Sequence, residues 1–223
     1  MKKYLVPSRL SANFFNLEAD INVLKKCNIK YIHIDVMDAQ FVPNLSMGMP
    51  IIKSINDHVG ADFTFDTHLM IDKPERYISD FKKVGADILT VHYEATSDIV
   101  KTLQSIKEQG MLAGVSIVPE TDVRVLYEVL PIADLVLVMS VHPGFGGQKF
   151  IESSLEKVKY LEDLRKKNSY KYIIEIDGGI DKTNIKRVLD EGVDFAVAGS
   201  AVFRDDIETN IKDFNKIIEA YNE

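Results

Sequence analysis

Short apolar runs rich in β-branched residues recur along the chain at fairly even spacing. Continuous runs of this kind are typical of parallel strands that are covered on both faces. They predict eight strands, at 4–8, 31–36, 63–69, 87–92, 112–118, 134–140, 172–177 and 194–198.

Between these runs, apolar residues recur at the spacing of an amphipathic helix. The clearest patterns predict a helix from Leu17 to near Cys27 and another from Ile99 that closes on Gly110, a residue that commonly ends helices. Two more helices are expected over 152–167 and 206–221. Strand and helix thus alternate eight times.

Alternating strands and helices imply a parallel sheet. Eight such units predict an α/β protein with the (β/α)₈ TIM-barrel fold, ahead of the alternative, a doubly wound open sheet with fewer strands. The sequence contains no linker, low-complexity tract or break in composition. We therefore expect residues 1–223 to form one barrel domain.

Composition narrows the class of protein. The 223 residues include 27 Lys and Arg against 34 Asp and Glu, a net charge of −7, and basic residues cluster only in short groups. A nucleic-acid surface needs clustered Lys and Arg, so we expect no nucleic-acid partner. No apolar stretch approaches the ~18 residues of a membrane span, and the first residues do not form a signal peptide. With Cys27 as its single cysteine, the chain is expected in the cytoplasm, away from membranes.

Four polar side chains stand at the predicted strand ends, where barrel enzymes carry their chemistry. His33 and Asp35 are two residues apart on the second strand, so both point to one face. His68 ends the third strand and Asp177 the seventh. Singly, each has an ordinary interpretation as a hydrogen-bonded core residue or a helix cap. As a set they would be costly to bury unpaired, and their nitrogen and oxygen atoms suit Zn, Mn, Fe or Co. Spacing alone leaves both interpretations open.

Glycine-rich segments follow the last three predicted strands. They are His142-Pro143-Gly144-Phe145-Gly146-Gly147-Gln148, Gly178-Gly179-Ile180 and Gly199-Ser200-Ala201. Glycine lets a backbone approach a ligand closely, and barrels often hold a phosphate at the loops after strands seven and eight. These segments predict a phosphate site built from backbone amides, although each could also be a plain tight turn.

Taken in order, the motifs resemble those of the ribulose-phosphate 3-epimerase family over nearly the whole chain. The segments that carry the resemblance are Pro7-Ser8-Arg9-Leu10-Ser11-Ala12, His33-Ile34-Asp35-Val36-Met37-Asp38, Phe41-Val42-Pro43-Asn44, His68-Leu69-Met70, Gly85-Ala86-Asp87, Val138-Met139-Ser140-Val141, Pro143-Gly144-Phe145-Gly146-Gly147-Gln148, Asp177-Gly178-Gly179-Ile180 and Ala198-Gly199-Ser200-Ala201-Val202-Phe203.

The resemblance implies metal-binding, catalytic and substrate-binding roles for individual residues. His33, Asp35, His68 and Asp177 would bind one divalent metal ion, and Asp35 and Asp177 would be the catalytic acid/base pair. Ser11, His68 and Asp177 would contact the sugar. The far end of the substrate and its phosphate would be held by Gly144, Phe145, Gly146, Gly147, Gly178, Gly179, Gly199 and Ser200.

The implied activity is that of an isomerase on a small sugar phosphate. It would interconvert D-ribulose 5-phosphate and D-xylulose 5-phosphate by moving a proton at C3, with the metal ion polarising the C2 ketone. Two opposed carboxylates can act in turn as base and acid. Met37, Met70 and Met139 would lie around the reacting carbons, unless they simply fill the core. The family further implies a phosphate-binding barrel and a homo-oligomer.

Some positions depart from the family pattern. Ala39-Gln40 stands where Gly-His is expected, Val118 where an Asn is usual, and His142 where Asn, Asp or Glu is commoner. Arg9 replaces an apolar residue. None is one of the four implied ligands, but the departures leave the preferred substrate open. The sequence does not identify the metal.

Three alternatives to this activity remain. One is a 3-epimerase of a six-carbon ketose phosphate such as allulose 6-phosphate. Another is a lyase of the hexulose-phosphate synthase type, which usually needs a lysine near the metal carboxylates, whereas only Lys149 lies near these motifs. The last is a non-catalytic sugar-phosphate sensor, which would not need two opposed Asp residues. The fold excludes none of them.

Overall fold

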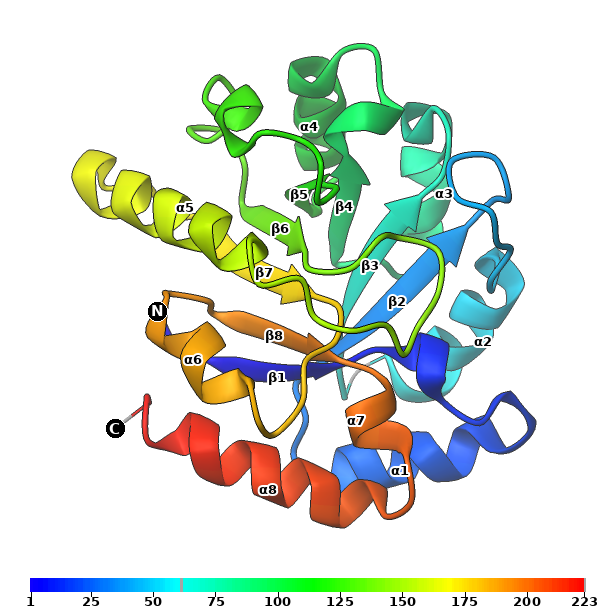
Figure 1. The fold of residues 1–223 in the computed structure, drawn as a ribbon. Coiled ribbons are helices and arrows are strands. Elements are labelled where there is room, and N and C mark those ends of the chain that lie inside the picture. Colours follow the sequence, from blue (N-terminus) through cyan, green and yellow to red (C-terminus); the bar gives the residue numbers. More distant parts are fainter. Residues whose placement is uncertain (61, 223) are drawn as a thin grey trace.

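Eight parallel strands surround one axis, and most helices lie outside them (Figure 1). The computed structural model describes residues 1–60 and 62–222. Strands follow the order β1-β8-β7-β6-β5-β4-β3-β2, and a parallel bridge between Ser8 and His33 brings the two edges together. The predicted (β/α)₈ barrel is therefore confirmed, whereas its limitation to a single domain stays a prediction.

The strands lie within one or two residues of the predicted ranges. They are β1 Tyr4–Pro7, β2 Tyr31–Met37, β3 Thr64–Met70, β4 Ile88–His92, β5 Leu112–Ile117, β6 Leu135–Met139, β7 Ile173–Asp177 and β8 Phe195–Ala198. The α-helices are α1 Leu17–Lys26, α2 Met49–Val59, α3 Ile78–Lys83, α4 Ile99–Glu108, α5 Ser154–Asn168, α6 Ile185–Asp190, α7 Ser200–Phe203 and α8 Ile207–Glu219.

The expected alternation of strand and helix is wrong after β5. The connection to β6 contains only a short 3₁₀ helix, Val123–Leu126, in place of an α-helix. Pro119 and Pro131 flank this segment, and proline cannot continue a helix. Leu126 and Leu130 are nevertheless buried, so the segment still covers the sheet.

The inside of the barrel is divided between an apolar end and a polar end. At the end where the strands begin, Tyr4, Tyr31 and Phe195 pack against one another with ring centroids 4.4 to 5.6 Å apart. Toward the ends of the strands, β2 and β3 pair in the register His33 with Asp66 and Asp35 with His68. This register places polar side chains of neighbouring strands side by side, because inward positions recur every two residues.

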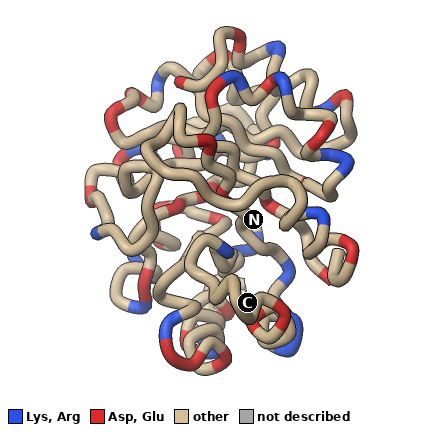
Figure 2. The backbone as a smooth tube through the Cα atoms, turned by 90° about the vertical axis from the view of Figure 1, so that its right-hand side faces the viewer, with Lys and Arg blue, Asp and Glu red and all other residues tan. Residues whose placement is uncertain are grey.

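Charged residues are mostly outside. In Figure 2, segments with Lys or Arg are interspersed with segments containing Asp or Glu along the helices and loops. Within residues 1–60 and 62–222, every helix is too short or too polar to cross a membrane.

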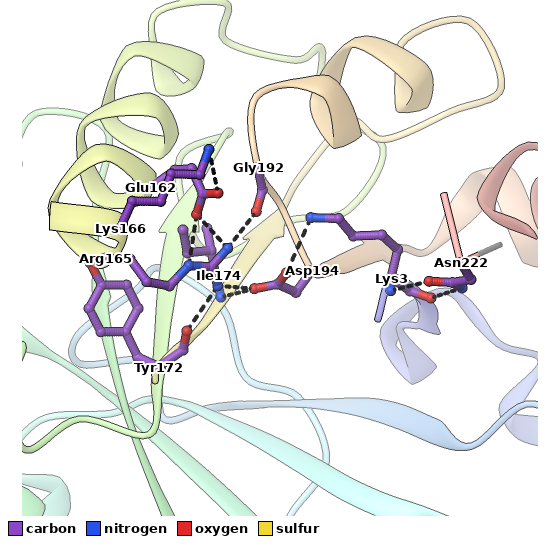
Figure 3. Close-up of polar contacts among 9 residues, drawn as sticks. All are labelled: Lys3, Glu162, Arg165, Lys166, Tyr172, Ile174, Gly192, Asp194 and Asn222. Carbon is purple, nitrogen blue, oxygen red and sulfur yellow. Dashed lines mark hydrogen bonds and ion pairs between the residues drawn. The ribbon is translucent and has the colours of Figure 1, made fainter. Parts of the chain in front are cut away.

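A buried ion pair ties α5 to the sheet (Figure 3). The Arg165 guanidinium contacts the Asp194 carboxylate, and it also donates to the carbonyl oxygens of Tyr172 at 3.0 Å and Gly192 at 3.2 Å. Asp194 in turn accepts from the Ile174 amide at 2.9 Å. Both charged side chains are less than a tenth exposed. Arg165 also pairs with Glu162, and Asp194 with Lys3 at 3.2 Å, so the buried charges are compensated within one small network.

We expect Asp194→Asn to lower the free energy of unfolding by about 2 kcal/mol, because it removes the more buried of the two carboxylates that compensate the Arg165 guanidinium. Urea denaturation measures the change. Glu152→Gln is the control, since Glu152 pairs with Arg187 at 2.9 Å on the surface with both side chains more than half exposed. The control should lose less than about 0.5 kcal/mol. Equal stability of the two variants would contradict this role of the ion pair.

Candidate active site

A cavity of about 340 Å³ opens where the strands end. Asp35 at β2 and Asp177 at β7 both line it, together with Met37, Met70 and Met139. The three methionines therefore lie beside the two carboxylates, at the place that the sequence indicated. A cavity of this size suits a small metabolite.

The structure brings the four proposed metal ligands together. One potential ligand atom from each of His33, Asp35, His68 and Asp177 lies within 4.8 Å of the other three. The two histidines are fully buried and Asp35 is 2% exposed. Two imidazoles and two carboxylates converging in this way could hold a divalent ion such as zinc.

Hydrogen bonding around Asp35 supports that interpretation. Ser8 Oγ donates to Asp35 Oδ2 at 2.6 Å, while Asp35 Oδ1 lies 3.3 Å from both His33 Nε2 and His68 Nδ1. His33 Nε2 is buried and has no hydrogen-bond partner in the described part of the chain. A buried polar atom without a partner is costly, and a metal ion would remove that cost. The donor set thus fits a divalent ion.

The environments of the two carboxylates differ. Burial raises the pKa of Asp35, but the charge of His33 and the polar contacts with His33 and His68 outweigh it and hold that pKa far below the usual range. Burial, followed by the negative charge of Asp35, raises the pKa of Asp177 to about 7. Near neutral pH one carboxyl group is therefore ionised and the other retains a substantial protonated fraction. Separation of this kind is common in acid/base pairs.

The two histidines also differ. Burial lowers the pKa of His33, but the charges of Asp66 and Asp35 outweigh it and hold the pKa well above its usual value. Burial lowers the pKa of His68 to about 4, against the opposing effect of Asp35. His68 is thus neutral at pH 7, the state in which imidazole binds a metal.

The proposed phosphate end lies along the same cavity. Its lining includes Ser11 and all of the predicted residues, namely Gly144, Phe145, Gly146, Gly147, Gly178, Gly179, Gly199 and Ser200. A Cβ atom at Gly199 would lie 2.6 Å from Ser11 Oγ, and one at Gly179 would lie 2.5 Å from the Phe150 backbone nitrogen. Gly179 also has a φ of +65°, so both the space and the backbone conformation favour glycine there.

Several polar residues of the site were not predicted. Asp66 and Glu175 stand two residues before His68 and Asp177 on β3 and β7, and His92 ends β4. All three are fully buried. The period of two that identified His33 with Asp35 would also have found Asp66 and Glu175, whereas the only signal for His92 is its place at the end of a strand. By contrast, Asp38, quoted within a site motif, accepts from the Gln40, Phe41 and Asp72 amides at the loop after β2.

The departures from the family pattern lie in different surroundings. Ala39 has a φ of +58°, a conformation that favours glycine. His142 lines the cavity but is mostly exposed, 3.0 Å from Glu120. Val118 lies after β5, where its amide donates to Glu94. The Arg9 guanidinium is fully buried, 5.8 Å from the centroid of the Phe203 ring.

Comparison with known proteins identifies the family of the chain. The model of the "Ribulose-phosphate 3 epimerase family" matches residues 4–203. The chain belongs to this family. Ribulose-phosphate 3-epimerase of Bacillus subtilis is 46% identical over 200 residues, which cover 89% of this chain and 91% of the relative. The Escherichia coli enzyme of the same name is 38% identical over 220 residues, which cover 98% and 95%. The resemblance seen in the sequence is thus confirmed.

More distant solved structures share the fold. A 3-hexulose-6-phosphate synthase from Salmonella typhimurium superimposes with a TM-score of 0.72 at 20% identity, over 99% of this chain and 100% of that one. A 3-keto-L-gulonate-6-phosphate decarboxylase from Vibrio cholerae gives 0.73 at 15% identity, over 99% of both chains. At these identities the likeness establishes the barrel and not the chemistry.

Zinc affinity should rise with pH. Metal ligands must lose their protons, and the pKa of Asp177 is raised to about 7. Below that pH we expect the affinity to fall at least about tenfold per pH unit, and loss of the proton from His33 steepens the dependence. Competition against a chelator of known affinity, from about pH 5.5 to about pH 8, measures it. A constant affinity below pH 7 would contradict the predicted ligand set.

Proposed function

We propose that this chain interconverts D-ribulose 5-phosphate and D-xylulose 5-phosphate, with Asp35 and Asp177 as the two acid/base groups at C3. The proposal depends mainly on one observation. The two carboxyl groups reach one cavity from β2 and β7, which are not neighbouring strands. A sugar held between them would present the two faces of its C3 to different carboxyl groups.

Asp35 is suited to remove the proton in one direction. Its carboxylate is held by Ser8 and kept ionised beside the two imidazoles. Loss of a C3 proton next to the C2 ketone gives an enediolate. Asp177, whose pKa is raised to about 7, then delivers a proton to the opposite face, which completes inversion. In the reverse direction the two residues exchange roles, as microscopic reversibility requires.

His33, Asp35, His68 and Asp177 would hold the divalent ion. When bound, the ion supplies positive charge that polarises the C2 carbonyl group and stabilises the developing negative charge. Zinc, manganese, iron and cobalt all suit a site of two nitrogen and two oxygen ligands. The protein side chains would orient the sugar and transfer the proton.

The remaining contacts would orient the substrate. We place the sugar near Ser11 and the phosphate along Gly144, Phe145, Gly146, Gly147, Gly178, Gly179, Gly199 and Ser200. Asn44 Nδ2 donates to the Gly144 carbonyl oxygen at 2.7 Å, so the loop after β2 contacts the glycine-rich loop after β6. Joined loops over the cavity would help to exclude water from a reactive enediolate.

The relatives favour a five-carbon substrate over the alternatives, because the curated proteins that match nearly the whole chain are named ribulose-phosphate 3-epimerase. The likeness to hexulose-phosphate synthase concerns the fold alone. Rates on ribulose 5-phosphate and allulose 6-phosphate compare the two epimerase activities directly. The homo-oligomer, the cytoplasmic location and the absence of nucleic-acid and membrane partners remain predictions.

Asp35→Asn and Asp177→Asn should each lower the rate of epimerisation by at least about 100-fold, because each lacks one of the two proton-transfer groups. In D₂O, each variant that still binds metal should exchange the C3 proton of only one of the two epimers. The two variants should act on opposite epimers. Proton NMR with each sugar phosphate separately follows the exchange, and metal analysis shows which samples contain the ion.

Asp72→Asn is the matched control, since Asp72 is an exposed carboxylate just after β3. It should retain the wild-type rate. An Asp35→Asn or Asp177→Asn enzyme that epimerises at nearly the wild-type rate would exclude that residue from the pair.

A further inference from the structure

The two histidines of the candidate metal site are hydrogen-bonded through different ring nitrogens. For His33, the nitrogen away from the site is Nδ1, which lies 2.5 Å from Asp66 Oδ2. Glu175 Oε1 is 3.6 Å from the same nitrogen, too far for a good hydrogen bond. A carboxylate can only accept, so Nδ1 carries the proton and donates it. When the ion is bound, Nε2, which faces Asp35 Oδ1 at 3.3 Å, gives up its own proton and presents the lone pair.

For His68, the nitrogen away from the site is Nε2. It lies 2.8 Å from Nε2 of His92, while His68 Nδ1 faces Asp35 Oδ1. One of the two imidazole nitrogens in this contact must donate and the other accept. A carboxylate stands at each end of this line, because His92 Nδ1 lies 3.3 Å from Glu94 Oε2 and His68 Nδ1 lies 3.3 Å from Asp35 Oδ1.

Binding of the ion decides between the two directions, because Asp35 would then bind the ion and Glu94 would be the carboxylate left to accept. Glu94 accepts, so His92 Nδ1 carries the proton and His92 Nε2 carries the lone pair. His68 therefore donates from Nε2 to His92, which leaves the lone pair of His68 on Nδ1. In the metal-bound protein the protons of this line thus point outward, toward Glu94.

Glu94 is itself held in place. Its Oε1 accepts from the Val118 amide at 3.1 Å and from the Thr121 hydroxyl. Its side chain is 23% exposed, whereas His92 is fully buried. The line of hydrogen bonds thus runs from the buried site to the backbone at the end of β5, near the surface.

We propose that Asp66 and the His92–Glu94 pair are positioning residues, which fix opposite tautomers of the two metal-ligating histidines. Asp66 makes His33 present Nε2 to the ion, and His92 with Glu94 makes His68 present Nδ1. The inference rests on the proposed function, because it takes His33 and His68 as metal ligands. Outer partners of metal-bound histidines commonly act in this way, and their loss weakens metal binding by ~10–100-fold.

The test reads the tautomers directly. The protein has five histidines, so a sample with ¹⁵N-labelled histidine gives a simple spectrum, and zinc, being diamagnetic, preserves it. Long-range ¹H–¹⁵N correlation of the zinc-loaded protein should show the remaining ring proton on Nδ1 of His33, on Nε2 of His68 and on Nδ1 of His92. A ring proton on Nε2 of His33 or on Nδ1 of His68 would overturn the proposal.

Variants test whether the outer residues set zinc affinity. Asp66→Ala and His92→Phe should each weaken zinc binding by ~10–100-fold, measured by competition with a chelator. Glu94→Gln keeps an acceptor oxygen and should lose less affinity than Glu94→Ala. Thr67→Val is the matched control, because Thr67 is also buried on β3 but alternates with Asp66 and His68 and so faces the other side. It should bind zinc like the wild type.

A merely structural role would give a different result. In that case the melting temperature of the zinc-free Asp66→Ala and His92→Phe proteins would fall, while the folded proteins bound zinc as tightly as the wild type. That outcome would overturn the proposal. Neither readout uses a substrate, so a protein with the expected tautomers and affinities that fails to epimerise ribulose 5-phosphate would count against the proposed function alone.

Discussion

Burial of ionisable side chains inside the barrel is the constraint on which the rest of the structure depends. His33, Asp35, His68 and Asp177 meet within hydrogen-bonding and ligand distances at the end of the strands. Water reaches little of this cluster, because both histidines are fully buried. Such groups are tolerated only when each is paired, hydrogen-bonded or bound to a metal. The surrounding residues can be understood as partners that meet this requirement and set the proton state of each group.

Along the strand axis, the residues that pack the barrel lie apart from the residues that line the cavity. Tyr4, Tyr31 and Phe195 fill the end where the strands begin, and the Arg165–Asp194 pair fastens α5 nearby. The opposite end carries the cavity and the polar side chains. A packed lower half holds the strands in fixed register, so the carboxyl groups above it are presented by rigid elements. Positions held in this way favour a reaction that depends on the two faces of one carbon.

Much of the fold and of the candidate site was predictable from the sequence, because side chains in a strand alternate between its two faces. Apolar runs located all eight strands, and residues two apart, such as His33 and Asp35, share a face whatever the fold. The glycine-rich segments could be placed on the cavity once the barrel was assumed. The four ligands could be gathered at one site only because parallel strands end at one mouth.

Other features depend on register and packing that the sequence does not show directly. The link from His68 to His92 requires β3 and β4 to pair so that the two side chains meet across strands, and the link to Glu94 requires the following turn. The 3₁₀ segment after β5 shows a local effect of proline overriding the regular alternation of helix and strand. Arg9 departs from the family pattern, which the sequence shows, but the sequence does not explain how its charged side chain is buried.

The account's central claim is that two different carboxyl groups transfer the proton at C3. The measurement that tests it most directly is proton NMR of ribulose 5-phosphate converted by the wild-type enzyme in D₂O. We predict that the xylulose 5-phosphate formed in the first turnovers carries solvent deuterium at C3, because the proton taken by one carboxyl group is not the one returned by the other. Xylulose 5-phosphate that retains the original C3 proton would contradict the claim.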